Sequence, residues 1–358
     1  MTSRTEARRI GGEFELAMDD FAGGADPGAP SLTFGAAQEI WVDTGRSALA
    51  LVARRLREVA PKGIVWLPAY SCESIAEPFL RQALAVRFYA VGAQLDRIDA
   101  SPGRGDTLLA IHYFGRRNLA ALRIIPQWRA NGVRVIEDCV QAALTTDVGT
   151  RGDHAVTSLR KLLPQPDGAL LASREALPAT LADASEAFVS ARMVGKVLRG
   201  AQAPADAYLP LLDKAERTLR ADLPRAMSWL SRHLLARADL AHIAARRRAN
   251  FAQLRQALAD QARRGVTPLL DPMHEGEVPL GYPVIVDAGR RDALRHHLAT
   301  DRIFCPVHWD LSHLPEGGFE QERALSASLL TLPIDQRYGD RDMAAIVDSI
   351  SNFSRDRS

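Results

Sequence analysis

Apolar positions along the first half of the chain follow two different patterns. Leu49, Val52, Leu56 and Val59 recur at steps of three or four residues, which indicates an amphipathic helix that begins near Thr44. Four short apolar runs lack this spacing, and we predict a strand in each of them. These runs cover residues 63–72, 85–91, 106–115 and 132–144. Helix-like segments at residues 71–83 and 118–130 lie between the strands, so strands and helices alternate.

This alternation predicts an α/β fold. Successive strand–helix–strand units are right-handed and build a mostly parallel sheet with helices on both faces. Residues 174 to about 262 are rich in Ala, Leu and Arg with helical spacing, and residues 281–289 and 329–353 suggest a smaller α+β unit. We therefore expect three parts: an irregular N-terminal arm, a large domain and a small C-terminal domain, at residues 1–40, 41–235 and 236–358.

Composition and charge narrow the class of protein. The 358 residues are 47% hydrophobic and 25% charged, with a net charge of +2, which argues against a nucleic-acid or membrane partner. Three widely spaced cysteines suit neither a disulfide framework nor a zinc site, and no metal site is expected. The N-terminus lacks the apolar core of a signal peptide, and no apolar run is long enough to span a membrane. We expect a cytoplasmic protein.

The candidate functional residues lie at the start of a predicted helix and at the ends of predicted strands. Ligands of open α/β sheets bind outside the carboxyl ends of the strands. The Thr44-to-Ser47 segment begins a helix, whose free N–H groups suit a phosphate group. An ordinary helix cap explains the same residues. Asp138 ends an apolar strand and would pair there with a cation, or cap the helix that follows.

Lys161 lies in a rigid turn before the next strand, where its amine could form an imine with a carbonyl compound. The alternative is a solvated surface lysine. Ser158, three residues earlier, could contact a phosphate or cap a turn. His112 ends the third strand, where a packed, hydrogen-bonded histidine is the simpler interpretation. Taken in chain order, the helix start at Thr44, Asp138 and Lys161 suit a phosphate group, a ring nitrogen and an aldehyde.

The segments TGRSALAL, LPAYSCESI, HYFG, IEDCVQA and SLRKLLPQPDGALL together resemble the DegT-type sugar aminotransferase family. The resemblance implies an aspartate-aminotransferase-like fold and pyridoxal 5'-phosphate as cofactor, with Lys161 holding it as a Schiff base. It also implies that Asp138 pairs with the pyridine nitrogen and that Gln141 lies against the ring. Arg46 and Ser47 would belong to the phosphate-binding helix start, and Ser158 would be a further phosphate contact.

Two departures from the family pattern concern the surroundings of the cofactor. The family commonly has an asparagine that reaches the phosphate in the partner subunit, but DLPRAMSWLS contains none. Arg225 or Ser228 is the candidate replacement. The aromatic residue that often covers the ring is replaced near Cys72, with Tyr70 close by. Because the active site of such enzymes lies between two subunits, the resemblance also implies a homodimer.

The function that the resemblance implies is transfer of an amino group from glutamate to a keto sugar on a nucleotide carrier. Two alternatives stay open at this point. The same cofactor could act on a cyclitol or another non-sugar ketone, or the chain could be a regulatory or scaffolding protein that kept the fold. The joint presence of Lys161, Asp138 and Gln141 argues against a scaffold, which has no need of all three.

Overall fold

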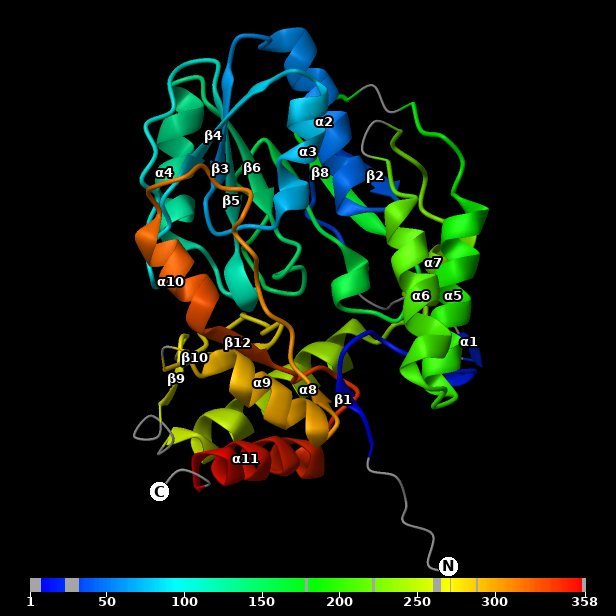
Figure 1. The fold of residues 1–358 in the computed structure, drawn as a ribbon. Helices are drawn as coiled ribbons and strands as arrows, with labels where there is room; N and C mark the ends of the chain where they lie inside the picture. Colours follow the sequence, from blue (N-terminus) through cyan, green and yellow to red (C-terminus); the bar gives the residue numbers. More distant parts are fainter. Residues whose placement is uncertain are drawn as a thin grey trace, which may run out of the picture.

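A seven-stranded sheet forms one lobe of the molecule, and a three-stranded sheet forms the other (Figure 1). The computed structural model describes seven ranges of the chain, namely residues 8–22, 32–177, 180–220, 223–259, 265–270, 272–287 and 289–355. The α/β architecture with a mostly parallel central sheet confirms the fold class expected from the sequence.

The large sheet has the strand order β2-β8-β7-β6-β5-β3-β4. Neighbours from β7 through β4 pair in parallel, whereas β8 pairs antiparallel with both β7 and β2. The four strands predicted from apolar runs are β3, β4, β5 and β6, and all four form. The strands span Gln38–Val42 (β2), Ile64–Pro68 (β3), Ala85–Tyr89 (β4), Thr107–Ile111 (β5), Arg134–Asp138 (β6), His154–Val156 (β7) and Ala169–Ser173 (β8).

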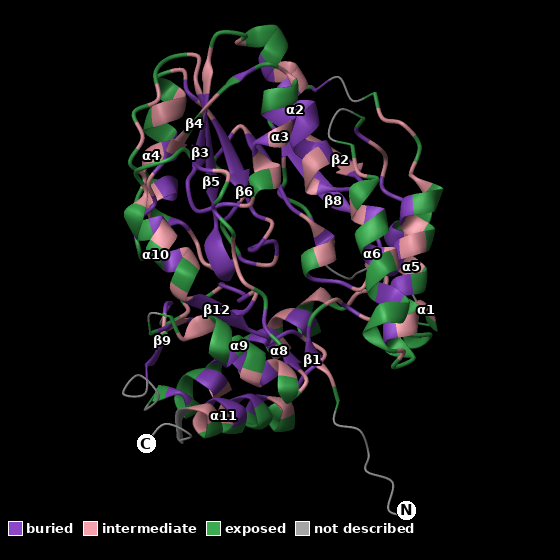
Figure 2. Cartoon of the chain, viewed as in Figure 1, coloured by how far each residue is buried: buried purple, intermediate pink, exposed green. Residues whose placement is uncertain are grey.

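Helices cover this sheet because its central strands are apolar on both faces. All five residues of β5 are buried, as are the last four residues of its neighbours β3 and β6, and these strands are largely purple in Figure 2. The predicted helix at Thr44 is α2, whose buried stripe includes Leu49, Val52 and Leu56. The covering helices span Gly45–Val59 (α2), Glu77–Arg81 (α3) and Leu119–Ala130 (α4), with 3-10 turns at Glu73–Ile75 (η1), Tyr113–Gly115 (η2) and Leu159–Lys161 (η3).

The helical section begins later than the sequence predicts. Strand β8 ends at Ser173, and the first helix starts only at Glu186, where the Ser185 hydroxyl accepts a hydrogen bond from the Phe188 N–H. Ala262, the predicted end of this section, lies outside the described residues. The helices span Glu186–Gly200 (α5), Ala205–Arg217 (α6), Trp229–Leu235 (α7) and Leu240–Ala257 (α8). Helices α5 and α6 pack side by side (Figure 1).

The small lobe is an antiparallel sheet in the order β12-β10-β9, packed against helices. Its own core includes Tyr282, Val284 and Leu332 from the sheet and Ile346 from the last helix. Its elements span Val266–Pro268 (β9), Tyr282–Val286 (β10), Arg291–Thr300 (α9), Ile303–Phe304 (β11), Glu320–Ser328 (α10), Leu329–Leu332 (β12) and Asp340–Arg355 (α11). The division of the chain at residues 40 and 235 stays a prediction.

The described part of the N-terminal arm is less irregular than expected, because it joins the small lobe. Ile10–Gly11 (β1) pairs in parallel with β11, and Asp19–Ala22 forms a short helix, α1. Gly11 adopts a φ of +82°, and a Cβ atom there would lie 2.2 Å from the Phe304 carbonyl oxygen. Only glycine permits this close approach of two backbones. The arm then continues toward α5, so it touches both lobes.

Candidate active site

A cavity of about 800 Å³ lies where the carboxyl ends of the parallel strands face the small lobe. Its walls come from segments far apart in the sequence: the start of α2, the ends of β5 and β6, the turn η3, the N-terminal arm and the stretch after β11. This is the position at which open α/β sheets bind ligands. Six predicted site residues line it: Arg46, Cys72, Asp138, Gln141, Ser158 and Lys161.

Asp138 is a buried carboxylate with few partners of its own. It is the last residue of β6, and its Oδ1 accepts one hydrogen bond from the Val140 N–H at 2.9 Å. Only 6% of the residue is exposed, and burial raises the pKa of its carboxyl to about 6, against the opposing effects of the Val140 amide and of His112. A carboxylate in this position gains from a cationic ligand.

Gln141 and His112 hold the loops beside Asp138. The Gln141 side-chain oxygen accepts the Phe114 N–H at 2.6 Å, which leaves its NH2 group as a donor at the cavity. His112 lies outside the cavity lining and is fully buried. Its Nδ1 accepts the Asn118 N–H at 3.0 Å, so its Nε2 carries the proton and donates to Glu137. His112 is thus a packed, hydrogen-bonded residue.

Lys161 is the last residue of the turn η3 and lines the cavity. Leu159, the first residue of the same turn, is buried in the core. Within the described part of the chain, the Lys161 ammonium has no hydrogen bond or ion pair. Its charge acts on His308, whose pKa is lowered first by burial and second by Lys161. His308 also lines the cavity, and its Nδ1 lies 3.0 Å from the Thr331 hydroxyl oxygen. Sequence patterns alone did not indicate this histidine.

The first turn of α2 faces the cavity through Gly45 and Arg46. Thr44 is the N-cap, as the alternative interpretation predicted, because its side chain accepts the Ser47 N–H at 3.2 Å. Ser47 itself is buried behind the turn, with its hydroxyl 3.3 Å from that of Thr44, and does not line the cavity. The Gly45 and Arg46 N–H groups remain at the open end of the helix.

Arg225 and Ser228 lie away from the cavity of their own chain. The Arg225 guanidinium donates to the Asp183 carbonyl at 2.8 Å, and the Ser228 hydroxyl donates to Asp167 at 2.6 Å. A contact of Arg225 with a partner subunit stays a prediction.

Cys72 lines the cavity, with its sulfur 3.1 Å from the Ser74 hydroxyl. Trp309, from the stretch after β11, supplies an aromatic side chain to the cavity wall, whereas Tyr70 donates its hydroxyl to the His308 carbonyl.

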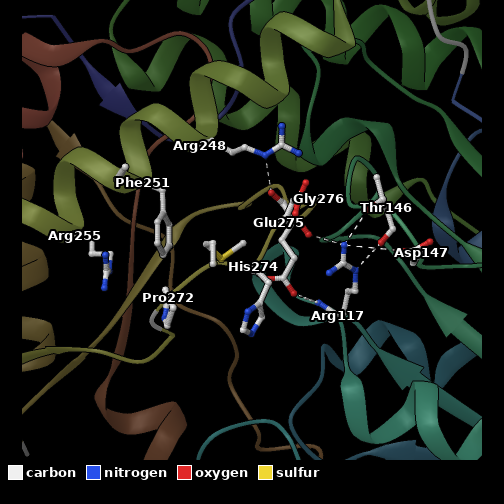
Figure 3. A pocket seen from close by; sticks show the side chains of 13 residues that line it. Arg117, Thr146, Asp147, Arg248, Phe251, Arg255, Pro272, His274, Glu275 and Gly276 are labelled. Carbon is white, nitrogen blue, oxygen red and sulfur yellow. Dashed lines mark hydrogen bonds and ion pairs between the residues drawn. The ribbon is translucent and has the colours of Figure 1, made fainter.

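A second cavity, of about 890 Å³, lies between α8 and residues 272–277 (Figure 3). Its polar side chains bond mainly to their neighbours: Arg117 donates to Thr146 and to the Glu275 carbonyl, and Arg248 donates to the Glu277 carbonyl. None of the predicted site residues lines this cavity, and the described residues that do line it include no lysine. It therefore offers no group for imine chemistry.

Solved structures with the same fold are aminotransferases of low sequence identity. A DegT DnrJ EryC1 StrS aminotransferase from Brucella abortus is 17% identical, with 90% of this chain and 87% of that chain covered and a TM-score of 0.62. The sugar aminotransferase CalS13 from Micromonospora echinospora is 19% identical, with coverage of 88% and 87% and a TM-score of 0.62. NtdA from Bacillus subtilis, solved with bound cofactor PMP, is 14% identical, with coverage of 90% and 74% and a TM-score of 0.66.

These likenesses show that the chain has the aminotransferase fold that the sequence motifs imply. No protein-family model matches the chain, and no curated protein matches it in sequence. Among the helices in the described ranges, none combines the length and apolar character needed to cross a membrane. Because the comparisons show the fold alone, we infer the function from the residues that line the cavity.

Proposed function

We propose that the protein is a pyridoxal-phosphate-dependent aminotransferase. The observation that carries this proposal is that Lys161 and Asp138 face one cavity, each with unused bonding capacity. An amine that can hold an aldehyde and a buried carboxylate that can pair with a pyridinium nitrogen are the two groups that this cofactor requires of a protein. The neighbours' fold supports the same function.

The residues present fit the cofactor at each of its ends. Lys161 would hold the aldehyde carbon, and Asp138 would pair with the ring nitrogen. The exposed N–H groups of Gly45 and Arg46 at the start of α2, with Ser158 beside them, suit the phosphate. Gln141 would lie against the ring. When bound, the cofactor supplies a carbonyl group that accepts an amine and a conjugated ring that delocalises negative charge.

The chain's own residues would then divide the work. The Lys161 amine, once free, would take the proton from the substrate Cα atom and deliver it to the carbon that carried the cofactor's aldehyde; with the keto acceptor it would move a proton in the opposite direction. Asp138 stays ionised beside the ring nitrogen and keeps that nitrogen protonated, since an ion pair lowers the pKa of a carboxyl that burial alone raises. Trp309 and Cys72, which line the same cavity, would limit the space beside the ring and help to exclude water.

We further propose that glutamate is the amino donor, that the acceptor is a keto sugar on a nucleotide carrier, and that the enzyme works as a homodimer. The motif resemblance and the sugar aminotransferase among the structural neighbours support the substrate class. The apolar residues Val194, Val197 and Leu209, each more than 40% exposed on α5 and α6, support contact with a second copy.

Borohydride reduction tests the proposal directly. Purified protein supplied with pyridoxal phosphate should become yellow, and reduction should attach the cofactor to the peptide that contains Lys161. Lys161→Arg is the matched variant, because it keeps the positive charge but cannot form an imine, and it should retain no label. A label on another lysine would refute the assignment of Lys161. Mass spectrometry with glutamate and nucleotide keto-sugars, cyclitols and simple ketones then identifies the acceptor.

A further inference from the structure

Three arginines surround one carboxylate on the wall of the cavity. The Glu216 side chain, from α6, accepts a hydrogen bond from Arg192 at 2.7 Å, from Arg46 at 3.0 Å, and from Arg160. The three arginines come from separate elements: α2, η3 and α5. All four side chains line the cavity. We call Arg46, Arg160 and Arg192 the arginine triad.

Positive charge exceeds negative charge in this cluster. Glu13, from the N-terminal arm, is the second carboxylate, and it pairs with Arg192 at 2.9 Å and with Lys196 at 3.3 Å. Four cations thus share two carboxylates, which gives the cluster a net charge of +2 although each cation has an acidic partner. Such an excess beside a cavity is costly unless an anion binds.

The arginines also keep unused donors. The Nε atoms of Arg160 and Arg192 are buried, and neither finds an acceptor anywhere in the described ranges. The Arg192 side chain is only 2% exposed, and the pKa of its guanidinium is lowered by burial and then by the neighbouring charge of Arg160. The unpaired donors and the burial of Arg192 indicate a positively charged region that favours a negatively charged ligand over solvent.

The position of the triad identifies the kind of anion. Arg46 belongs to the first turn of α2, whose free N–H groups face the same cavity. Guanidinium groups and helix N-termini both bind phosphate oxygens, and a phosphate monoester carries about two negative charges near neutral pH. We propose that the arginine triad is a phosphate-binding site contained within one chain, with Arg160 as a direct ligand and Glu216 holding the three guanidinium groups in place.

The proposed site would supply, within one chain, the phosphate contact that the family named above takes from the partner subunit. The segment that resembles the family's asparagine-bearing loop contains Arg225 and Ser228, and both side chains bond to other groups of their own chain. The phosphate could belong to the cofactor or to a nucleotide carried by the substrate. The assignment to the cofactor rests on the proposed function, whereas the phosphate site itself does not.

Ligands with and without phosphate separate these cases. We would measure the dissociation constants of pyridoxal phosphate and of pyridoxal for the full chain and for Arg160→Gln. The relevant ratio is the dissociation constant of pyridoxal divided by that of pyridoxal phosphate, which measures the contribution of the phosphate. Because charged hydrogen bonds contribute strongly, losing one should reduce this ratio by ~10-fold or more. Pyridoxal itself should bind unchanged. Arg55→Gln is the matched control, because Arg55 also lies on the cavity-bearing lobe and pairs with Glu175, but it does not line the cavity.

The outcomes distinguish the two sources of phosphate. If the ratio holds but uridine diphosphate binds the cofactor-loaded Arg160→Gln protein ~10-fold more weakly, the triad holds the substrate's phosphate. If neither changes, or if pyridoxal weakens as much as pyridoxal phosphate, the triad is not a phosphate site. Should Arg160→Gln fail to fold, Arg46→Gln takes its place, since Arg46 is more exposed and lies at the end of a helix.

Failure of the proposed function gives a different result. If the unmodified chain binds neither pyridoxal phosphate nor pyridoxal, inorganic phosphate is titrated into it by calorimetry. Binding that weakens in Arg160→Gln but not in Arg55→Gln would keep the phosphate site and remove the aminotransferase. A chain that binds no phosphate at all would overturn the triad.

Discussion

Glu137 and Asp138 are adjacent in β6, yet their carboxylates serve opposite faces of the sheet. Glu137 is fully buried and accepts hydrogen bonds from His112 Nε2 at 3.0 Å and from the N–H groups of Gly149, Arg151 and Gly152. Asp138 faces the cavity with one hydrogen bond, from Val140. Because side chains alternate along a strand, one acid stabilises the fold and its neighbour remains available for a ligand.

The buried state of Asp138 predicts that removing its charge stabilises the cofactor-free protein. A carboxyl whose folded pKa is raised favours folding fully below its ordinary pKa of 3.8 and loses that contribution as the pH rises through about 6. The loss amounts to about 3 kcal/mol at neutral pH. In urea unfolding, cofactor-free Asp138→Asn should therefore be more stable than the unmodified chain at pH 7.5, with the difference shrinking toward zero at pH 4.

The same variant should be a poor enzyme. An uncharged amide cannot keep the ring nitrogen protonated, so turnover should fall by ~100-fold or more, which corresponds to about 3 kcal/mol in the barrier. Asp348→Asn, at an exposed position of α11, is the control and should alter neither property. Near-normal turnover in Asp138→Asn would show that this residue is only a helix cap.

Removing the charge of Glu137 should have the opposite effect to removing that of Asp138 and should destabilise the protein. Burial would raise the pKa of its carboxyl, but the hydrogen bond from His112 and those from the backbone amides outweigh burial and lower it. Glu137→Gln places an NH2 group against N–H donors and should cost about 3 kcal/mol at pH 7, measured by urea unfolding. Since a lowered pKa contributes stability above the ordinary value of 4.5, the difference should shrink at lower pH.

The surface acid Glu58 provides the comparison for this variant. Its side chain is 56% exposed and pairs with Arg55 at the surface, so Glu58→Gln should change the unfolding free energy by less than ~0.5 kcal/mol. A Glu137→Gln protein that is as stable as Glu58→Gln would mean that the amide network around Glu137 contributes nothing measurable.

His308 should remain neutral over the working range of the enzyme. Burial and the positive charge of Lys161 lower the pKa of its imidazole, so the ring stays uncharged and does not titrate between pH 5 and 8. His308→Gln should change the magnitude of kcat/KM but leave the shape of its pH profile as it is. The control is His296→Gln, at an exposed position of α9. An inflection near pH 6 to 7 that disappears only in His308→Gln would refute this.

The chain should assemble as a homodimer, which light scattering at working concentration can measure. A fully active monomer would refute the prediction. Mixing Lys161→Ala with Arg225→Ala then tests whether Arg225 acts across the interface. Because the arginine triad supplies phosphate contacts within one chain, we expect Arg225→Ala to keep most of its activity by itself. Low activity that returns on mixing would instead place Arg225 at the partner's site.

Local pattern was sufficient for the elements that hold the site. The spacing of Leu49, Val52 and Leu56 predicted α2, and the apolar run before Asp138 predicted β6, because periodicity and strand ends are set by neighbouring residues. The rules of parallel sheets then placed Asp138 at the edge of the sheet where the cavity lies. Burial of a central strand follows from its composition in the same way.

The sequence by itself determined which residues could do chemistry, but only the tertiary structure decided which of them meet. Arg160, Arg192, Glu216 and Glu13 are separated by up to about two hundred residues, and no local spacing links them. Their ion pairs form because α5, α6 and the N-terminal arm pack around one cavity wall. Likewise, the guanidinium of Arg225 finds its partner at the Asp183 carbonyl, 42 residues away in the sequence. Contacts between distant segments depend on packing of the whole chain, which residue periodicity does not encode.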